Sequence, residues 1–244
     1  MTTATSHAST IDTHLKHFEA MKSAHTEAML KLNDIGQALT RCKKDLEATQ
    51  EKSKEDETSW RSRFRSLRGE ITQEMKQEHT QRIVQRELAE EYRALIEEME
   101  LDQQSAMLSC CDSGKNYIRA YNTAFVTYAE SQWNAAMRSL SPTLVRAIKL
   151  KRMALSIDGE GQENQLGYVE PEQAIKQLLG EKLTDVAAST VLDIKGEPVL
   201  EKIGLHRPAL TGVDMKMFRL GAIGKMKMYA DLREKREALS KGKK

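Results

Sequence analysis

Helix-breaking residues are almost absent from the first part of this chain. Proline is missing from the first 141 of its 244 residues, and the only glycines there are Gly36, Gly69 and Gly114. All four prolines and the other ten glycines follow. Because proline breaks helices and glycine weakens them, the first 141 residues can form nearly continuous helix. The rest of the chain must turn often.

The composition suits long helices that are exposed on much of their surface. Hydrophobic residues make up 39% of the chain and charged residues 30%, but aromatic residues only 5%, which is little material for one thick core. We therefore predict an all-α fold, an elongated bundle of long helices with a short, loop-rich C-terminal part. The net charge of +2 gives no general electrostatic case for nucleic-acid binding.

A heptad seam marks the first predicted helix, which we expect from about Ser9 or Thr10 toward Glu57. Its apolar positions alternate four and three residues apart, the spacing that keeps one stripe facing a partner helix. The seam comprises Met21, His25, Ala28, Leu32, Ile35, Leu39, Cys42 and Leu46. Because His25, Ala28 and Cys42 are imperfect seam residues, an antiparallel helical hairpin or loose bundle is favoured over a two-stranded zipper.

Several breaks are predicted along the chain. The charged segment Glu51–Thr58 is a candidate turn, and a pattern shift near Asp112–Gly114 indicates a bend or a helix start. Ser141 and Pro142 resemble an N-cap followed by proline at the first helical position. These breaks suggest three regions, residues 1–57, 58–156 and 157–244.

The C-terminal region combines loops with short elements. Residues 158–167 contain three glycines and no periodicity, which predicts a loop, and a helix is expected from Pro171 to about Ala188. Residues 191–200 are a candidate small hairpin. The tail from Lys225 is predicted to be a basic helix, since residues 225–244 carry eight Lys or Arg against three Asp or Glu.

No recognised catalytic motif is present. The sequence has no phosphate loop, GxGxxG, GxSxG or HExxH pattern. His14 and His17 lie one turn apart but lack a third ligand, so two solvated histidines are favoured over a metal site. Cys110 and Cys111 lack a CxxC context, so buried packing is favoured over redox chemistry. We expect no enzyme activity, no cofactor and no metal.

The chain carries no signal for membrane insertion or secretion. No run of 18 apolar residues occurs, and the polar N-terminus lacks an apolar signal region. The three cysteines, Cys42, Cys110 and Cys111, match neither a disulfide framework nor a zinc motif. A reducing cytoplasm is the predicted location.

Two oppositely charged segments are candidate contact surfaces. Residues 90–102 hold six acidic residues against Arg93, and a solvated face is the simpler interpretation over docking of a basic partner. Arg61, Arg65 and Arg68 lie beside an apolar stripe that begins with Trp60 and Phe64. Those two aromatics can be core, a protein interface or, least favoured, a nucleic-acid surface. Opposite charges along one chain favour self-association or a charged partner.

A methionine-rich stretch lies near the C-terminus, including Met226 and Met228. Methionine fills cores and also serves adaptable binding surfaces, and both interpretations stay open. The candidates for protein contacts are Trp60, Arg61, Phe64, Arg65, Arg68, Glu97, Glu98, Glu100, Met226, Met228, Arg233 and Arg236.

Several segments in order resemble one known family. They are Trp60-Arg-Ser-Arg-Phe, Arg86-Glu-Leu-Ala-Glu-Glu-Tyr, Cys111-Asp-Ser, Leu144-Val-Arg-Ala-Ile, Gly167-Tyr-Val-Glu-Pro-Glu-Gln-Ala and Gly196-Glu-Pro-Val-Leu. The family is Sid, the capsid size-determination proteins of satellite phages that parasitise a larger helper phage. The resemblance runs from about Trp60 to Leu205 and rests on helical pattern alone before Trp60. After Leu205 the chain is expected to depart from the family, with its own basic tail.

The resemblance implies a helical external scaffold that works in the host cytoplasm. Such a protein self-associates into a cage outside the procapsid, binds hexamers of the helper's major capsid protein, and favours a smaller shell. It would be absent from mature virions, and the resemblance carries over no individual contact residues. The alternatives are a helical nucleic-acid-binding or antitermination regulator and a generic coiled-coil interaction protein. The regulator would require the basic groups near Arg61–Arg68 and in the C-terminal tail to converge.

Overall fold

Helices are the only regular secondary structure in the described part of the chain. A computed structural model describes residues 2–161 and 166–242, with side chains described from residue 9 to residue 241. Its helices are α1 (Thr2–Ser66), α2 (Gln73–Arg138), α3 (Pro142–Asp158), α4 (Pro171–Ser189), α5 (Pro198–Ile203), α6 (Met215–Arg219) and α7 (Ala222–Gly242). The all-α prediction is confirmed, and part of the predicted loop at 158–167 lies outside the described residues.

The predicted turn at Glu51–Thr58 is wrong. Helix α1 runs through this segment to Ser66, because its glutamates and lysines are good helix formers and no glycine or proline interrupts them. The chain reverses instead after Ser66, where Arg68 and Gly69 both have positive φ, at 51° and 89°. Gly69 adopts this left-handed conformation without steric cost. Helix α1 also begins earlier than predicted, at Thr2.

Two other predictions of local structure need correction. Helix α2 continues without a break through Asp112–Gly114, so neither a bend nor a helix start occurs there. Residues 191–200 do not form a hairpin, because Pro198 starts α5 at a position where its missing N–H is not needed. Pro142 and Pro171 begin α3 and α4 as predicted, although the Ser141 side chain makes no capping hydrogen bond.

The chain comprises two compact units, each built from segments that are distant in sequence. Unit 1 contains Met1–Lys16 and Tyr121–Arg207, and unit 2 contains His17–Ala120 and Pro208–Lys244. The long helices α1 and α2 therefore each contribute to both units. The three regions suggested by the sequence stay a prediction.

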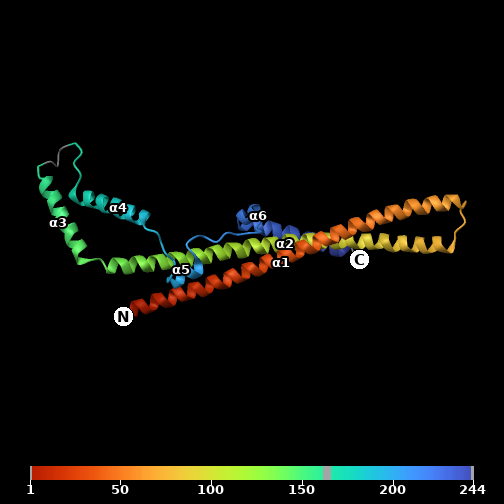
Figure 1. Cartoon of the computed structure of the whole chain (residues 1–244), viewed down its shortest axis with the longest axis horizontal. Coiled ribbons are helices and arrows are strands. Elements are labelled where there is room, and N and C mark those ends of the chain that lie inside the picture. The colour runs from red at the N-terminus through yellow and green to blue at the C-terminus, as the bar shows by residue number, and fades with distance from the viewer. Residues whose placement is uncertain (1, 162–165, 243–244) are drawn as a thin grey trace. The chain divides into compact units, whose positions relative to one another are not determined.

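Unit 2 is built on an antiparallel pair of helices, as the heptad seam predicted. Early residues of α1 lie opposite late residues of α2, with Phe18 5.3 Å from Tyr117 between ring centroids. Toward the turn, Lys43 pairs with Glu100 at 2.7 Å and Arg63 with Glu78 at 2.6 Å. Figure 1 shows these two helices side by side and in opposite directions.

The seam of α1 faces the core of unit 2 along its whole length. His25, Leu32 and Leu39 are buried, and the other five seam residues are half-buried. Leu32 packs with Ala106 and Cys110 of α2 in one core cluster. The seam prediction is confirmed because a three-and-four spacing fixes which residues share one helix face.

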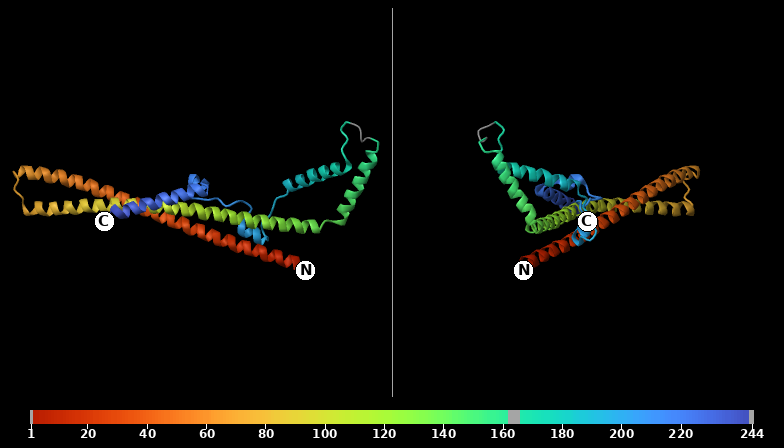
Figure 2. Two further views of the ribbon diagram at one scale, coloured as in Figure 1. Left: turned by 180° about the vertical axis from the view of Figure 1, so that it is seen from behind. Right: turned by 60° about the vertical axis from the view of Figure 1, so that its left-hand side comes forward.

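The C-terminal segment adds a third layer to unit 2. Leu232 of α7 forms a second core cluster with Leu101 and Leu108 of α2, and half-buried Met217, Met228 and Leu239 pack against it. The two views in Figure 2 show α7 in blue lying along α2. The predicted basic helix from Lys225 is thus part of the folded unit, with its apolar side on α2.

Unit 1 packs about the last quarter of α2 against shorter elements. Tyr121, Ala124 and Tyr128 are buried on one face of α2, and the Tyr128 hydroxyl donates a hydrogen bond to Glu197 just before α5. Helices α3 and α4 contact each other. None of the residues of α3 is buried, and Ile175 is the one buried residue of α4.

Candidate protein-interaction surfaces

Trp60 and Phe64 close the tip of the hairpin in unit 2. Their rings stack at 5.1 Å between centroids, and the Trp60 indole N–H donates to the Met75 carbonyl oxygen at 3.4 Å. The Arg82 guanidinium lies 5.2 Å from the centre of the indole ring. Met75 is buried while Trp60 and Phe64 are half-buried. These contacts favour the core interpretation for both aromatics, although part of each side chain is exposed.

The arginines around the tip divide into paired and unpaired groups. Arg61 pairs with Glu57 on its own helix, and Arg63 pairs with Glu78 across the hairpin. Arg65 and Arg68 are exposed, and neither makes an ion pair among the described residues. A partner surface can therefore reach two guanidinium groups at the turn without first breaking an ion pair within the chain.

The acidic run of α2 and the basic helix α7 meet inside unit 2. Arg236 pairs with Asp102 at 2.6 Å, and Lys225 pairs with Asp112. Glu100 is engaged by Lys43 from α1. Part of the opposite charge that suggested contacts between chains is thus neutralised within this unit, which sequence order alone could not reveal.

The remaining candidates differ in exposure. Glu97 and Glu98 are exposed on α2, and Glu97 lines a groove of about 670 Å³ together with Leu101, Lys235 and Leu239. Met226 is 72% exposed, whereas Met228 packs into the core. Arg233 is exposed and pairs with Glu237 on its own helix at 3.0 Å. Met228 therefore fits the core interpretation, and the binding interpretation of Met226 stays a prediction.

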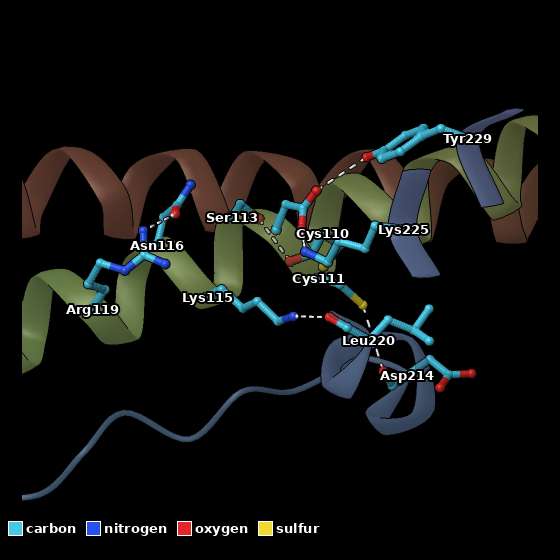
Figure 3. A network of polar contacts seen from close by, with 11 residues as sticks. Cys110, Cys111, Ser113, Lys115, Asn116, Arg119, Asp214, Leu220, Lys225 and Tyr229 are labelled. Carbon is cyan, nitrogen blue, oxygen red and sulfur yellow. Dashed lines mark hydrogen bonds and ion pairs between the residues drawn. The ribbon is translucent and has the colours of Figure 1, made fainter. Parts of the chain in front are cut away.

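A polar network that the sequence did not predict fastens the C-terminal segment to α2 (Figure 3). Lys115 donates to the Leu220 carbonyl at 2.9 Å, and its ammonium lies 5.3 Å from the Phe218 ring centre. The Tyr229 hydroxyl donates to Asp112 at 3.3 Å. Asp214 caps α6 by accepting from the N–H groups of Lys216 and Met217. Partners more than 100 residues apart leave no local sequence signal.

The two adjacent cysteines lie within this network. Cys110 and Cys111 are fully buried, and burial raises the pKa of both thiols. The Cys111 thiol donates to the Asp214 carbonyl at 3.7 Å. A buried thiol with a raised pKa is a poor nucleophile, which supports the packing interpretation.

His25 is the one buried polar residue in the core of the described chain, at 4% exposure. Its Nδ1 lies 3.0 Å from the Ser113 hydroxyl, which itself donates to the Cys110 carbonyl at 2.9 Å. Because that hydroxyl proton is already used, Nδ1 carries the hydrogen and donates to Ser113. The opposite nitrogen, Nε2, is buried without a partner, and burial lowers the pKa of the ring.

The predicted absence of a metal site stays a prediction. His14 is half-buried and His17 exposed. Within residues 2–161 and 166–242, no group of three or more His, Cys, Asp or Glu residues is placed to hold a metal ion. In the same residues, no helix is both long and apolar enough to cross a membrane.

Comparisons with known proteins find similarity over nearly the whole chain. No protein-family model matches the sequence. Glycoprotein 3 of Enterobacteria phage P4 is 26% identical over 217 residues, which cover 89% of this chain and 88% of that protein. The solved structure of the satellite phage P4 procapsid including the size determination (Sid) protein matches with a TM-score of 0.80 and 26% identity.

The chain resembles Sid. The match covers 97% of this chain and 100% of the Sid chain. It therefore extends on both sides of the Trp60–Leu205 segment in which individual motifs were recognised. The expectation that the chain departs from Sid after Leu205 is wrong, because the C-terminal helices belong to the shared fold. Helical pairing preserves a fold while the exposed residues change, so short motifs underestimate the extent of the relationship.

Proposed function

We propose that this protein is a non-enzymatic capsid assembly factor, an external scaffold that directs formation of a small procapsid. It would bind hexamers of a helper phage's major capsid protein and self-associate into a cage on the outside of the procapsid. It would act in the host cytoplasm and leave before the virion matures. The observation that carries the proposal is the likeness to Sid, seen in a procapsid, over almost the full length of both chains.

The chemistry of the chain supports a binding role. Its buried cysteines are held as neutral thiols, and its charged residues lie on helix surfaces. Such a scaffold would act by binding the more curved lattice more tightly than the flatter one. A closed cage makes many weak contacts cooperate, so no single contact needs high affinity.

Several of the candidate contact residues are available for these contacts. Arg65, Arg68, Glu97, Met226 and Arg233 are exposed in unit 2. By contrast, Trp60, Phe64, Glu100, Met228 and Arg236 each make contacts with other residues of unit 2. We therefore place the partner surface on the first group and assign a mainly structural role to the second.

The nucleic-acid alternative required the two basic segments to converge. The C-terminal end of α7 lines a groove with residues 94–104 of α2, whereas the tip arginines lie near Met75. About 20 residues of α2 separate the two places, or roughly 30 Å along a helix. No observation favours this alternative.

Co-expression with a helper's coat protein tests the proposal. We expect small shells to outnumber large ones when the intact chain is present, and large shells alone without it, as counted by electron microscopy. The proposal would be overturned if the distribution of shell sizes were the same with and without the chain in every combination of coat protein and expression level.

A further inference from the structure

A short non-helical strap contacts both long helices of unit 2. It comprises residues 208–214, which lead into α6. The Thr211 hydroxyl donates to the Met29 sulfur of α1 at 3.9 Å, and the Cys111 thiol of α2 donates to the Asp214 carbonyl at 3.7 Å (Figure 3). The strap therefore covers a place where α1 and α2 meet, beside a buried thiol.

His25 of α1 lies next to this strap. A Cβ at Gly114 would lie 3.1 Å from the Leu210 side chain and 3.2 Å from His25 Cε1, so the leucine of the strap and the imidazole ring converge on one glycine of α2. His25 is 4% exposed, and its Nε2 has no hydrogen-bond partner among the described residues. Because Cε1 is bonded to Nε2, this nitrogen is one bond away from the place where ring and strap converge.

The groups around the imidazole ring give it no countercharge. From α2, Cys110 and Tyr117 lie beside the ring, and burial raises the pKa of both, so both are neutral between pH 5 and pH 8. The one charged residue of the strap is Asp214, whose carboxylate accepts from two N–H groups of α6. On α1, Lys22 lies one turn away and is exposed. A protonated ring would thus hold a second N–H group in the core without an acceptor.

Of the elements around the ring, the strap can move at the lowest cost. Pro208, Leu210 and Val213 are only half-buried, and no N–H group of residues 209–213 makes a hydrogen bond to another described residue. Separating α1 from α2 would instead break a core cluster that includes Leu32 and Cys110. Segments with few buried contacts and few hydrogen bonds open before the rest of a folded unit.

We propose that His25 and the strap form a pH-sensitive latch, in which protonation of His25 opens residues 208–214 while α1 and α2 stay paired. The opened strap lets water accept the Nε2 hydrogen, which the closed unit leaves without a partner. The latch is a property of unit 2 alone and does not depend on the proposed function.

The direction of the pH effect follows from linkage. Burial lowers the pKa of His25 in the closed unit, and opening returns it toward the ordinary value of about 6.5. The open form therefore binds a proton that the closed form does not, and it becomes more frequent as pH falls below that value. Between pH 7.5 and pH 5.5 the open fraction should rise by up to about tenfold.

The Cys111 thiol reports the opening, because it is fully buried and in contact with the last residue of the strap. The full-length chain carries Cys42→Ser, which removes the half-buried thiol of α1. Its reaction with a pyridyl disulfide is followed at pH 7.5 and pH 5.5, and mass spectrometry locates the label. Each rate is divided by that of the same chain unfolded in urea at the same pH, which gives the open fraction. A quotient that does not rise at pH 5.5 would overturn the latch.

The urea dependence of labelling separates opening of the strap from unfolding of unit 2. The effect of urea on an equilibrium scales with the surface exposed, and a seven-residue strap exposes little. Labelling below the unfolding transition should therefore be nearly independent of urea at both pH values. A steep dependence at pH 5.5 would assign the exposed thiol to unfolding of the whole unit and would overturn the latch.

Variants at both parts of the latch complete the test. His25→Leu should abolish the rise at pH 5.5, and His25→Gln should do the same if the leucine variant has lost helix content. Leu210→Ala should increase labelling at both pH values, because it removes a contact of the strap. The matched controls are His17→Gln and His206→Gln, which remove exposed histidines and should keep the natural rise. A rise that survives in both His25 variants or disappears in the controls, or unchanged labelling of Leu210→Ala, would overturn the proposal.

Discussion

At the scale of single residues, His25 couples the stability of unit 2 to pH. Its Nδ1 donates to Ser113, and its Nε2 is buried without a partner. Protonation would place a charge and an unpaired N–H group in the core, which is the reason that burial lowers the pKa of this ring below its ordinary value.

The sign of the resulting pH dependence follows from linkage. Because the folded-state pKa of His25 is lowered, the unfolded chain binds its proton first, near the ordinary histidine pKa of about 6.5. The free energy of unfolding should therefore decrease as pH falls below that value. Urea titrations at pH 8 and pH 5.5 should show this loss, and His25→Leu should show much less of it. An equal loss in the variant would assign the effect to other groups.

The two tryptophans make a matched pair of predictions. Trp60 stacks on Phe64 and bonds to α2, so Trp60→Ala should lower the free energy of unfolding by about 2–3 kcal/mol, below the range for a fully buried tryptophan because it is half-buried. Trp133 is mostly exposed, so Trp133→Ala should change the unfolding of the isolated chain by less than about 0.5 kcal/mol. Denaturant titration measures both. Equal effects would contradict the assignment of Trp60 to the core.

At the scale of elements, the sequence correctly predicted the features that depend on the spacing of neighbouring residues. The seam of α1 and the proline-started helices α3 and α4 were correct, because helix faces and caps depend on neighbours within a few residues. The turn at Glu51–Thr58 was wrong, since polar charged residues permit a turn without requiring one. Helix α1 ends at Ser66, and the polypeptide reverses just after it, where Arg68 and Gly69 take positive φ.

Contacts between distant elements were not accessible to sequence reasoning. Lys115 meets Leu220, 105 residues later, and Tyr229 meets Asp112 across 117 residues. No neighbouring residue in the sequence indicates which distant residue each of them contacts. For the same reason the candidate contact residues included both residues that pair with another helix of the unit, such as Arg236, and residues without an ion pair, such as Arg65.

Gly114 allows three segments of unit 2 to meet. A Cβ at this position would lie 3.1 Å from Leu210 and 3.2 Å from His25, so these side chains occupy the space that any other residue would need. Gly114→Ala should therefore destabilise unit 2 by about 1–2 kcal/mol despite the better helix propensity of alanine. Gly180 of α4 has open space around it, so Gly180→Ala should stabilise by up to about 1 kcal/mol. In thermal denaturation the melting temperature should fall for Gly114→Ala and rise for Gly180→Ala. Changes of the same sign in both variants would contradict this packing argument.

At the scale of the whole molecule, the tip arginines test how the proposed scaffold recognises its partner. Reversing Arg61, Arg65 and Arg68 together to Glu should abolish small shells during co-expression, because many copies of a weak charged contact add up. One reversal should do little, since an exposed pair contributes only about 0–1 kcal/mol. The control is Lys149, Lys151 and Arg152 to Glu on α3, with the same total charge change. If small shells persist although the tip variant is soluble and helical, the tip arginines are not needed for recognition, and apolar contacts must supply the binding.

Salt should affect assembly and folding differently. Surface charges that meet a partner are screened as the Debye length falls from about 10 Å at 0.1 M salt to about 3 Å at 1 M. Binding of the chain to shells, measured by co-sedimentation, should weaken over that range. The helix content should not change, because the core clusters of unit 2 are apolar. Binding that is insensitive to salt would remove the charged surfaces from recognition.

The antiparallel pairing of α1 and α2 also sets an order of folding events. Trp60 reaches Met75 across 15 residues, whereas Phe18 meets Tyr117 across 99. Closing the longer loop first would cost about 1.7 kcal/mol more in chain entropy than closing the shorter one. The two helices should therefore zip together from the Trp60 end. Helix α7 follows both long helices in the sequence, so it is synthesised after them and can pack on α2 when the hairpin has already formed.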